Sequence, residues 1–257
     1  MAELPDLEVF SQILSRRFKN KTLKTIEVKV AKKLNVATDE LVKSLTGKKL
    51  TAVTRYGKTL HFHFDEDVLQ IHLMLRGELK ALEKGTEVPN HTILAFWFSG
   101  GEGFAVVDVL KAATTTLNPP PAKAPDALEM ELEHFSAVLS KSKKMVKEVM
   151  MDQQKMRGIG NSYADEILWD AKISPFSIAS TIPEKSVKKL FSSLGDVLKG
   201  AIKAIGKENG DELRGELRDF MKIHGSGIEK SPTGTKVKSE KIAGRTAYYT
   251  DEQQLYN

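Results

Sequence analysis

The residues best suited to covalent chemistry stand at the start of the chain, where Ala2 is followed directly by Glu3. Because alanine is small, we expect the initiator methionine to be removed, which leaves a free α-amine on Ala2. An α-amine has a pKa of about 8, far below that of a lysine, so part of it is neutral and attacks an aldehyde carbon to form a Schiff base. A neighbouring carboxylate can move the protons that such a reaction requires. Ala2 and Glu3 are therefore a candidate nucleophile and acid–base pair.

A glycine turn in the second half of the chain has the features of a phosphate site. Gly158 and Gly160 permit a tight turn, and Asn161 is a favourable N-cap residue. Apolar residues then follow at helical spacing: Ala164, Ile167, Leu168 and Ala171. The start of such a helix presents backbone N–H groups and the positive end of its dipole to an anion. An ordinary capped helix that binds nothing gives the same local pattern.

The composition limits the classes of protein. The 257 residues carry a net charge of +5 and include no cysteine. The modest positive charge favours a polyanionic partner without requiring one. The lack of cysteine excludes disulfides, thiolate zinc sites and cysteine nucleophiles, and it fits a reducing cytoplasm. No secretion signal and no apolar run long enough to span a bilayer is visible, so we expect a cytoplasmic protein without a membrane partner.

The first half of the chain predicts one helix followed by strands. Apolar residues recur at helical spacing from Pro5 to about Asn20. Beyond them, apolar and polar residues alternate in segments near 26–30, 60–64, 69–75, 93–98 and 104–109, the last two joined by a glycine-rich turn. This period-two pattern is typical of an antiparallel sandwich or barrel.

The composition changes at Asn118. A stiff, proline-rich stretch follows, the patterns from Ala127 to Phe220 are helical, and residues after His224 are rich in Gly, Ser, Lys and Thr. The last segment, from Val237 to Tyr249, predicts a hairpin that turns at Ala243 and Gly244. We therefore expect an N-terminal domain, a linker, a helical domain and a terminal hairpin segment, at residues 1–118, 119–125, 126–222 and 223–257.

Segments near both ends of the chain resemble one family. Residues 1–8 resemble the catalytic N-terminus, and residues 151–166 the helix-two-turns-helix motif, of the formamidopyrimidine-DNA glycosylase and endonuclease VIII family. The resemblance extends over essentially the whole chain, more loosely in the middle. It implies an α+β fold: an antiparallel β-sandwich with a flanking helix, a helical domain with the helix-two-turns-helix motif, and a C-terminal β-hairpin finger. The family acts in base-excision DNA repair.

The resemblance assigns catalytic roles near the N-terminus. In the family the terminal amine, usually on proline, is the nucleophile, and the next acidic residue handles protons at the deoxyribose; these positions are Ala2 and Glu3. Alanine is the main departure, although a primary amine still forms an imine. Residues 55–58 resemble the family hairpin whose lysine grips phosphates beside the lesion, which adds Lys58. The competing interpretations are an ordinary N-terminal alanine, a helix-start carboxylate and a solvated hairpin lysine.

The resemblance also implies DNA contacts. Residues 71–77 resemble the strand that carries a phosphate-contacting histidine, here His72. The residue that fills the space of the extruded base falls on Leu75, with Met74 beside it. An apolar wedge can fill such a gap, but core packing explains both side chains too. Asn161 takes the phosphate-binding place in the helix-two-turns-helix motif. The Arg and Phe that the family supplies after the last strands are absent from residues 107–113.

The C-terminal residues resemble the finger of the family, with Arg245 as the phosphate-binding arginine at the hairpin tip. Most members hold this hairpin with four cysteines around zinc, whereas this chain has none and resembles the zincless members. We expect no metal and no cofactor, since His61 and His63 also lack a third ligand. Side chains expected to pack the hairpin instead are Val237, Ile242, Tyr248, Tyr249, Leu255 and Tyr256.

The resulting hypothesis is a monomeric, nucleoid-associated bacterial DNA glycosylase with abasic-site lyase activity. Its partner would be double-stranded DNA that contains a damaged base or an abasic site. An alternative is a damaged-DNA-binding protein of the same fold with weak or no catalysis. A nucleic-acid-binding module that uses only the helix-two-turns-helix segment is a third class, which the matching N-terminus argues against.

Overall fold

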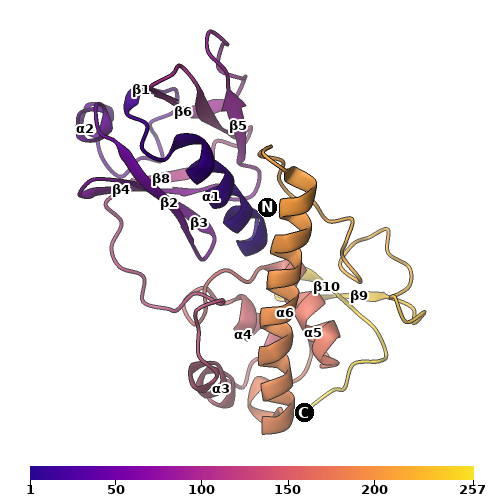
Figure 1. The fold of residues 1–257 in the computed structure, drawn as a ribbon. Coiled ribbons are helices and arrows are strands. Elements are labelled where there is room, and N and C mark those ends of the chain that lie inside the picture. The colour runs from indigo at the N-terminus through magenta and orange to yellow at the C-terminus, as the bar shows by residue number, and fades with distance from the viewer. The chain divides into compact units, whose positions relative to one another are not determined.

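The computed structural model describes residues 1–257 and divides into two compact units. The first unit comprises Met1–Pro121 and Ile205–Leu217, and the second comprises Ala122–Ala204 and Arg218–Asn257. The division falls inside the long helix α6, Glu184–Asn209, which is orange in Figure 1. Each unit is thus built from two separate stretches of chain. The return of residues 205–217 to the first unit has no counterpart in the boundaries expected from the sequence.

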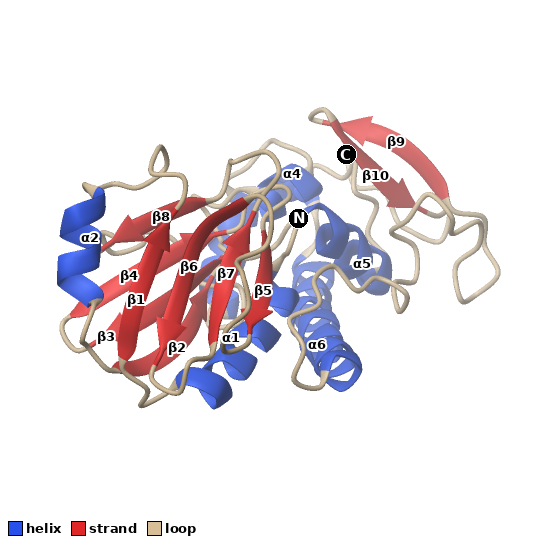
Figure 2. Cartoon of the chain, turned by 90° about the horizontal axis from the view of Figure 1, so that it is seen from above, coloured by secondary structure: helices blue, strands red, loops and turns tan.

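The first unit is a sandwich of two four-stranded antiparallel sheets, drawn as red arrows in Figure 2. One sheet has the order β1 (Leu23–Val28), β6 (Thr92–Phe98), β7 (Gly103–Val107) and β5 (Glu78–Leu82). The other has the order β2 (Leu50–Tyr56), β3 (Thr59–Phe64), β4 (Asp67–His72) and β8 (Thr114–Leu117). The sandwich prediction is confirmed.

Aromatic rings from both sheets meet in the core of the first unit. Phe62 on β3 stacks on Phe104 of β7 with ring centroids 5.1 Å apart, and both side chains are buried. Helix α1 (Leu4–Phe18) adds Phe18, whose ring stacks on Phe98 at 4.7 Å. Such stacking supplements the burial of large apolar surfaces, so α1 is fixed against the sandwich.

Several elements of the first unit were not evident from the sequence: α2 (Thr38–Leu45), β2, β5 and β8. A register shift between Leu50 and Ala52 interrupts the alternation of β2, and β8 is mostly threonine. The segment predicted over 69–75 ends earlier, because β4 stops at His72 and Met74 adopts a left-handed backbone with φ 57°.

The second unit holds the short helices and the terminal hairpin. Its helices are α3 (Leu132–Ser140), α4 (Val146–Met151), α5 (Asn161–Ala171), the 3-10 turn Ala179–Thr181 and α6 up to Ala204. The expectation of helix up to Phe220 is wrong: α6 ends at Asn209, where the left-handed Gly210, with φ 56°, follows. None of the helices is both long and apolar enough to cross a membrane.

The hairpin prediction is confirmed. Strands β9 (Lys238–Ile242) and β10 (Arg245–Tyr249) pair antiparallel around Ala243 and Gly244. Both turn residues have positive φ, 47° and 77°, which is the geometry that a two-residue type I′ turn requires.

Candidate functional site

The N-terminal residues are held rigidly at the start of α1. Ala2 is 6 % exposed and Glu3 is 2 % exposed. Glu3 is the N-cap residue, and its backbone N–H donates to Asp6 Oδ2 at 2.9 Å as part of a capping box. Glu3 thus has the helix-start role in the structure, while its chemical role stays a prediction.

A cavity of 1130 Å³ in the first unit adjoins this N-terminus. Its lining includes Met1, Ala2, the turn residues 75–77, Val109, Leu110 and residues 211–216. The Met1 α-amine forms an ion pair with Glu216. Among the predicted site residues of this unit, Ala2 and Leu75 line the cavity, whereas Glu3, Lys58, His72 and Met74 do not.

A tight turn after β4 presents Leu75 to this cavity. The Gly77 N–H donates to the Leu73 carbonyl at 2.9 Å, and a Cβ on Gly77 would lie 2.2 Å from that oxygen, so only glycine fits. Leu75 is 60 % exposed, which excludes core packing for it, while Met74 is half-buried. His72 Nδ1 accepts from the Met74 N–H at 2.8 Å, so a neutral His72 carries its proton on Nε2.

The loop after β7 presents two more apolar side chains to the cavity. Asp108 is fully buried and accepts from the backbone N–H groups of Leu110, Ala112 and Ala113 at 2.9, 2.7 and 2.8 Å. Val109 and Leu110 are 62 % and 54 % exposed. The sequence reasoning looked here for Arg and Phe and missed these residues; the available signal was a pair of large apolar residues beyond the alternating strand.

Lys58 follows the left-handed Gly57, φ 58°, in the β2–β3 turn. Its side chain is only 9 % exposed, so the interpretation as a solvated lysine is wrong. The Arg55 side chain, 4 % exposed, places Nε 2.7 Å from Glu8 Oε2 and so joins this hairpin to α1. The hairpin and the N-terminal residues are therefore positioned by the same helix.

In the second unit, the glycine turn before α5 is closed by Gln153. Its Nε2 donates to the Ile159 carbonyl at 2.8 Å, and its Oε1 accepts from the Gly158 N–H at 3.0 Å. The N-cap residue is Gly160 rather than Asn161, which corrects the expectation. Asn161 is the first helical residue, and its Nδ2 donates to the Thr246 carbonyl at 2.9 Å.

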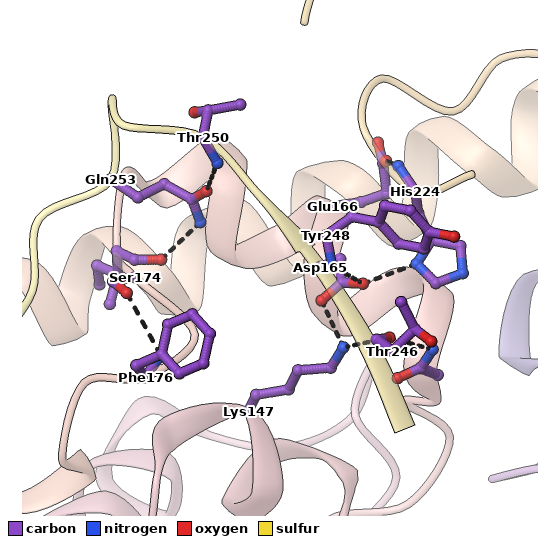
Figure 3. Close-up of polar contacts among 12 residues, drawn as sticks. Lys147, Asp165, Glu166, Ser174, Phe176, His224, Thr246, Tyr248, Thr250 and Gln253 are labelled. Carbon is purple, nitrogen blue, oxygen red and sulfur yellow. Dashed lines mark hydrogen bonds and ion pairs between the residues drawn. The ribbon is translucent and has the colours of Figure 1, made fainter. Parts of the chain in front are cut away.

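A buried charge cluster joins α4, α5 and the hairpin. Lys147 and Asp165 are fully buried, with Lys147 Nζ 2.6 Å from Asp165 Oδ1 and 3.3 Å from the Thr246 carbonyl. Asp165 Oδ2 lies 2.7 Å from His224 Nδ1 and accepts from the Tyr248 N–H at 3.0 Å. Figure 3 shows Lys147 and His224 pointing toward Asp165. Pairing of this kind is what allows charged groups to be buried.

The neighbouring carboxylate, Glu166, holds the chain before the hairpin. It accepts from the backbone N–H groups of Lys222, Ile223 and His224 at 2.9, 2.9 and 2.8 Å. Two adjacent acids on α5 thus fix the segment at 222–224 and strand β10. The hydrogen bond from Asn161 to the Thr246 carbonyl places Asn161 beside β10, the strand that begins at Arg245.

Aromatic contacts supplement this cluster. Tyr248 packs edge-on against His224 with ring centroids 5.0 Å apart, and Tyr249 against Phe176 at 5.1 Å. Burial, together with the hydrogen bond to Glu240, raises the pKa of Tyr249 to about 12. Ile242 is buried as expected, whereas Leu255 is 47 % exposed.

Known proteins match this chain along its full length. The family model described as the formamidopyrimidine-DNA glycosylase N-terminal domain matches residues 1–115, and the one described as its H2TH domain matches residues 122–211. The formamidopyrimidine-DNA glycosylase of Lactobacillus gasseri is 31 % identical over 275 residues, which covers 100 % of both chains.

The chain belongs to the formamidopyrimidine-DNA glycosylase family. This membership makes it a DNA glycosylase, an enzyme class of base-excision repair. Among solved structures, the Lactococcus lactis glycosylase in complex with DNA containing an abasic site superposes with a TM-score of 0.88 at 26 % identity, covering 98 % of this chain and 99 % of that one. The same bacterial enzyme with DNA containing a formamidopyrimidine lesion gives 0.89 at 27 % identity, covering 98 % and 100 %.

For a glycosylase of this family, the buried cluster of Lys147, Asp165 and His224 is the feature that the sequence reasoning missed. Lys147 ends a lysine-rich run, residues 141–147, yet it is fully buried, so it is not part of a solvated helix face. Lys141, Lys143 and Lys144 are exposed. No three His, Asp or Glu side chains group as metal ligands in the structure.

Proposed function

We propose that this glycosylase binds duplex DNA, turns a damaged nucleotide out of the helix, releases its base and cleaves the resulting abasic site as a lyase. The observation that carries the proposal is that Ala2, whose α-amine becomes terminal when Met1 is removed, borders a cavity large enough for an extruded base. Its place of action would be the nucleoid in the bacterial cytoplasm.

The proposed chemistry begins at the Ala2 amine. Its lone pair attacks C1′ of the damaged nucleotide, the bond from C1′ to the base breaks, and the base leaves with a proton. Glu3 protonates the ring oxygen of the sugar, so that the ring opens and an iminium forms between C1′ and the amine. Loss of a proton from C2′ then expels the 3′ phosphate, and water hydrolyses the imine to free the enzyme.

DNA would be held by groups in both units. Lys58 and His72 in the first unit, and Asn161 and Arg245 in the second, would contact phosphates, to which arginine donates in a bidentate manner. The first turn of α5 adds the positive end of its dipole. Leu75, beside Met74, would fill the space of the extruded nucleotide. The exposed Val109 and Leu110 would support the base left opposite, in place of the absent Arg and Phe.

Borohydride trapping on duplex DNA with an abasic site tests the catalytic step. The protein with a free Ala2 amine is expected to form a reducible covalent adduct, and Ala2→Pro is expected to preserve or increase it. Acetylation of the terminal amine should abolish trapping. Trapping that persists after acetylation would assign the nucleophile to a lysine such as Lys58, and DNA binding without trapping or base release would make the protein a damage-binding protein.

A further inference from the structure

The cavity beside Ala2 is lined by charged side chains, and four of its five carboxylates pair with a cationic side chain. Glu78 pairs with Lys80 at 2.7 Å, Glu83 with Arg17 at 3.3 Å, and Glu212 with Arg214 at 2.6 Å. Asp211 pairs with Arg16 at 2.9 Å, whereas Glu216 pairs with the Met1 amine, which is lost when Met1 is removed. Four of the five acidic side chains of the lining are thus neutralised by side chains that remain after Met1 is removed.

Arg76 is the lining cation that remains without a carboxylate. It is exposed, and it lies between Leu75 and Gly77 in the turn that the Gly77 N–H closes. The backbone of that turn is constrained because Gly77 admits no Cβ, so the guanidinium projects from a rigid support. An unpaired guanidinium in a cavity is a ready donor for a ligand that presents oxygen acceptors.

We propose that Arg76 is a specificity-determining residue that donates hydrogen bonds to the extruded base. This inference rests on the proposed function: if the Ala2 amine attacks C1′, the base bonded to C1′ enters the cavity that Ala2 and Arg76 line. A planar guanidinium matches two acceptor oxygens at once, and its charge opposes a cationic ligand. We therefore expect Arg76 to favour a base with neighbouring carbonyl oxygens over a base that carries a positive alkyl-nitrogen charge.

The test compares lesions that retain a base with sites that lack one. Arg76→Gln is assayed for single-turnover release of a hydantoin base, which is rich in carbonyl oxygens, and for cleavage of a preformed abasic site. Loss of a hydrogen bond from a charged donor is expected to slow base release by roughly 10- to 100-fold. Abasic-site cleavage is expected to stay at the wild-type rate, because no base is present for Arg76 to contact.

Two controls make the outcome decisive. Lys80→Gln removes a cavity cation that already has a carboxylate partner, and it is expected to leave both rates unchanged. The affinity for duplex DNA that contains a hydantoin is compared with the affinity for DNA that contains a tetrahydrofuran abasic analogue. This comparison measures the preference for the base without catalysis, and Arg76→Gln should remove that preference. If Arg76→Gln lowered the affinity for both DNAs equally, Arg76 would contact a phosphate and the proposal would be overturned. An unchanged rate of base release would also overturn it. Failure of the wild-type protein on every substrate would instead refute the proposed function.

Discussion

The buried pair of Lys147 and Asp165 leads to a quantitative prediction about the finger hairpin. Lys147→Met keeps the length of the side chain but leaves the Asp165 carboxylate, which is fully buried, without its cation at 2.6 Å. Removing one partner of a buried ion pair costs about 3–5 kcal/mol. For a chain of this size, that loss corresponds to a fall in Tm of roughly 6–20 °C.

The variant should also loosen the hairpin itself. Lys147 Nζ contacts the Thr246 carbonyl, and Asp165 accepts from the Tyr248 N–H, so two of the contacts that hold β10 belong to the disrupted cluster. Hydrogen exchange at the Tyr248 amide should therefore accelerate, and DNA affinity should fall because Arg245 is no longer positioned. Urea unfolding followed by circular dichroism gives the free energy of unfolding of the same samples.

Lys144→Met is the matched control for this prediction. Lys144 is exposed and belongs to the same lysine-rich run, so its replacement should change the free energy of unfolding by no more than about 0.5 kcal/mol. If Lys147→Met matched this control in unfolding free energy and in Tyr248 exchange, the buried pair would not be what holds the hairpin.

Three further predictions concern DNA contacts, the finger and the apolar loop. The logarithm of the DNA-binding constant should fall with the logarithm of the salt concentration, at a slope of about −0.9 per neutralised phosphate. Arg245→Ala should make the slope shallower by about one such contact, whatever the base sequence of the DNA. A slope that does not change would contradict a phosphate role. Ultraviolet titration should show Tyr249 ionising near its raised pKa of about 12, and Glu240→Gln should lower that pKa. The associated stability is present below the ordinary pKa of 10.0 and is lost as pH rises through about 12, so no loss in that interval would contradict the assignment. Asp108→Ala should leave three backbone N–H groups without their acceptor and reduce lesion excision more than abasic-DNA binding, as measured by single-turnover kinetics and by titration.

The sequence was sufficient for the elements that follow simple periodicity. Helix α1, the central strands and the hairpin at Ala243 and Gly244 lie where the patterns indicated. The spacing of neighbouring apolar residues shows which face is buried, and the residue types of a turn show its geometry. Strand β2 was not predicted, because its register shift interrupts the alternation of apolar and polar residues. The end of β4 was misjudged because the left-handed Met74 breaks the strand without a glycine or proline at that position.

The buried cluster was not predictable in the same way. Lys147, Asp165 and His224 are separated by 18 and 59 residues, counted from the printed numbers, and nothing local distinguishes a buried lysine from its exposed neighbours. Their meeting depends on tertiary packing around α5. Likewise, the sequence indicated a role for Leu75 in filling the space of the extruded base. It did not indicate that the cavity carboxylates pair with other cations and leave Arg76 without a carboxylate partner.

The return of residues 205–217 to the first unit has a consequence for synthesis on the ribosome. Leu213 packs against the sandwich core, Arg16 contacts the Gly210 carbonyl at 3.2 Å, and a Cβ on Gly215 would lie 3.6 Å from the Phe10 ring. When the nascent chain has emerged only as far as Pro121, these contacts do not yet exist, and part of α1 remains uncovered. The sandwich therefore completes its folding late, after most of the second unit has been translated, and the delay leaves apolar surface open to aggregation or to chaperones.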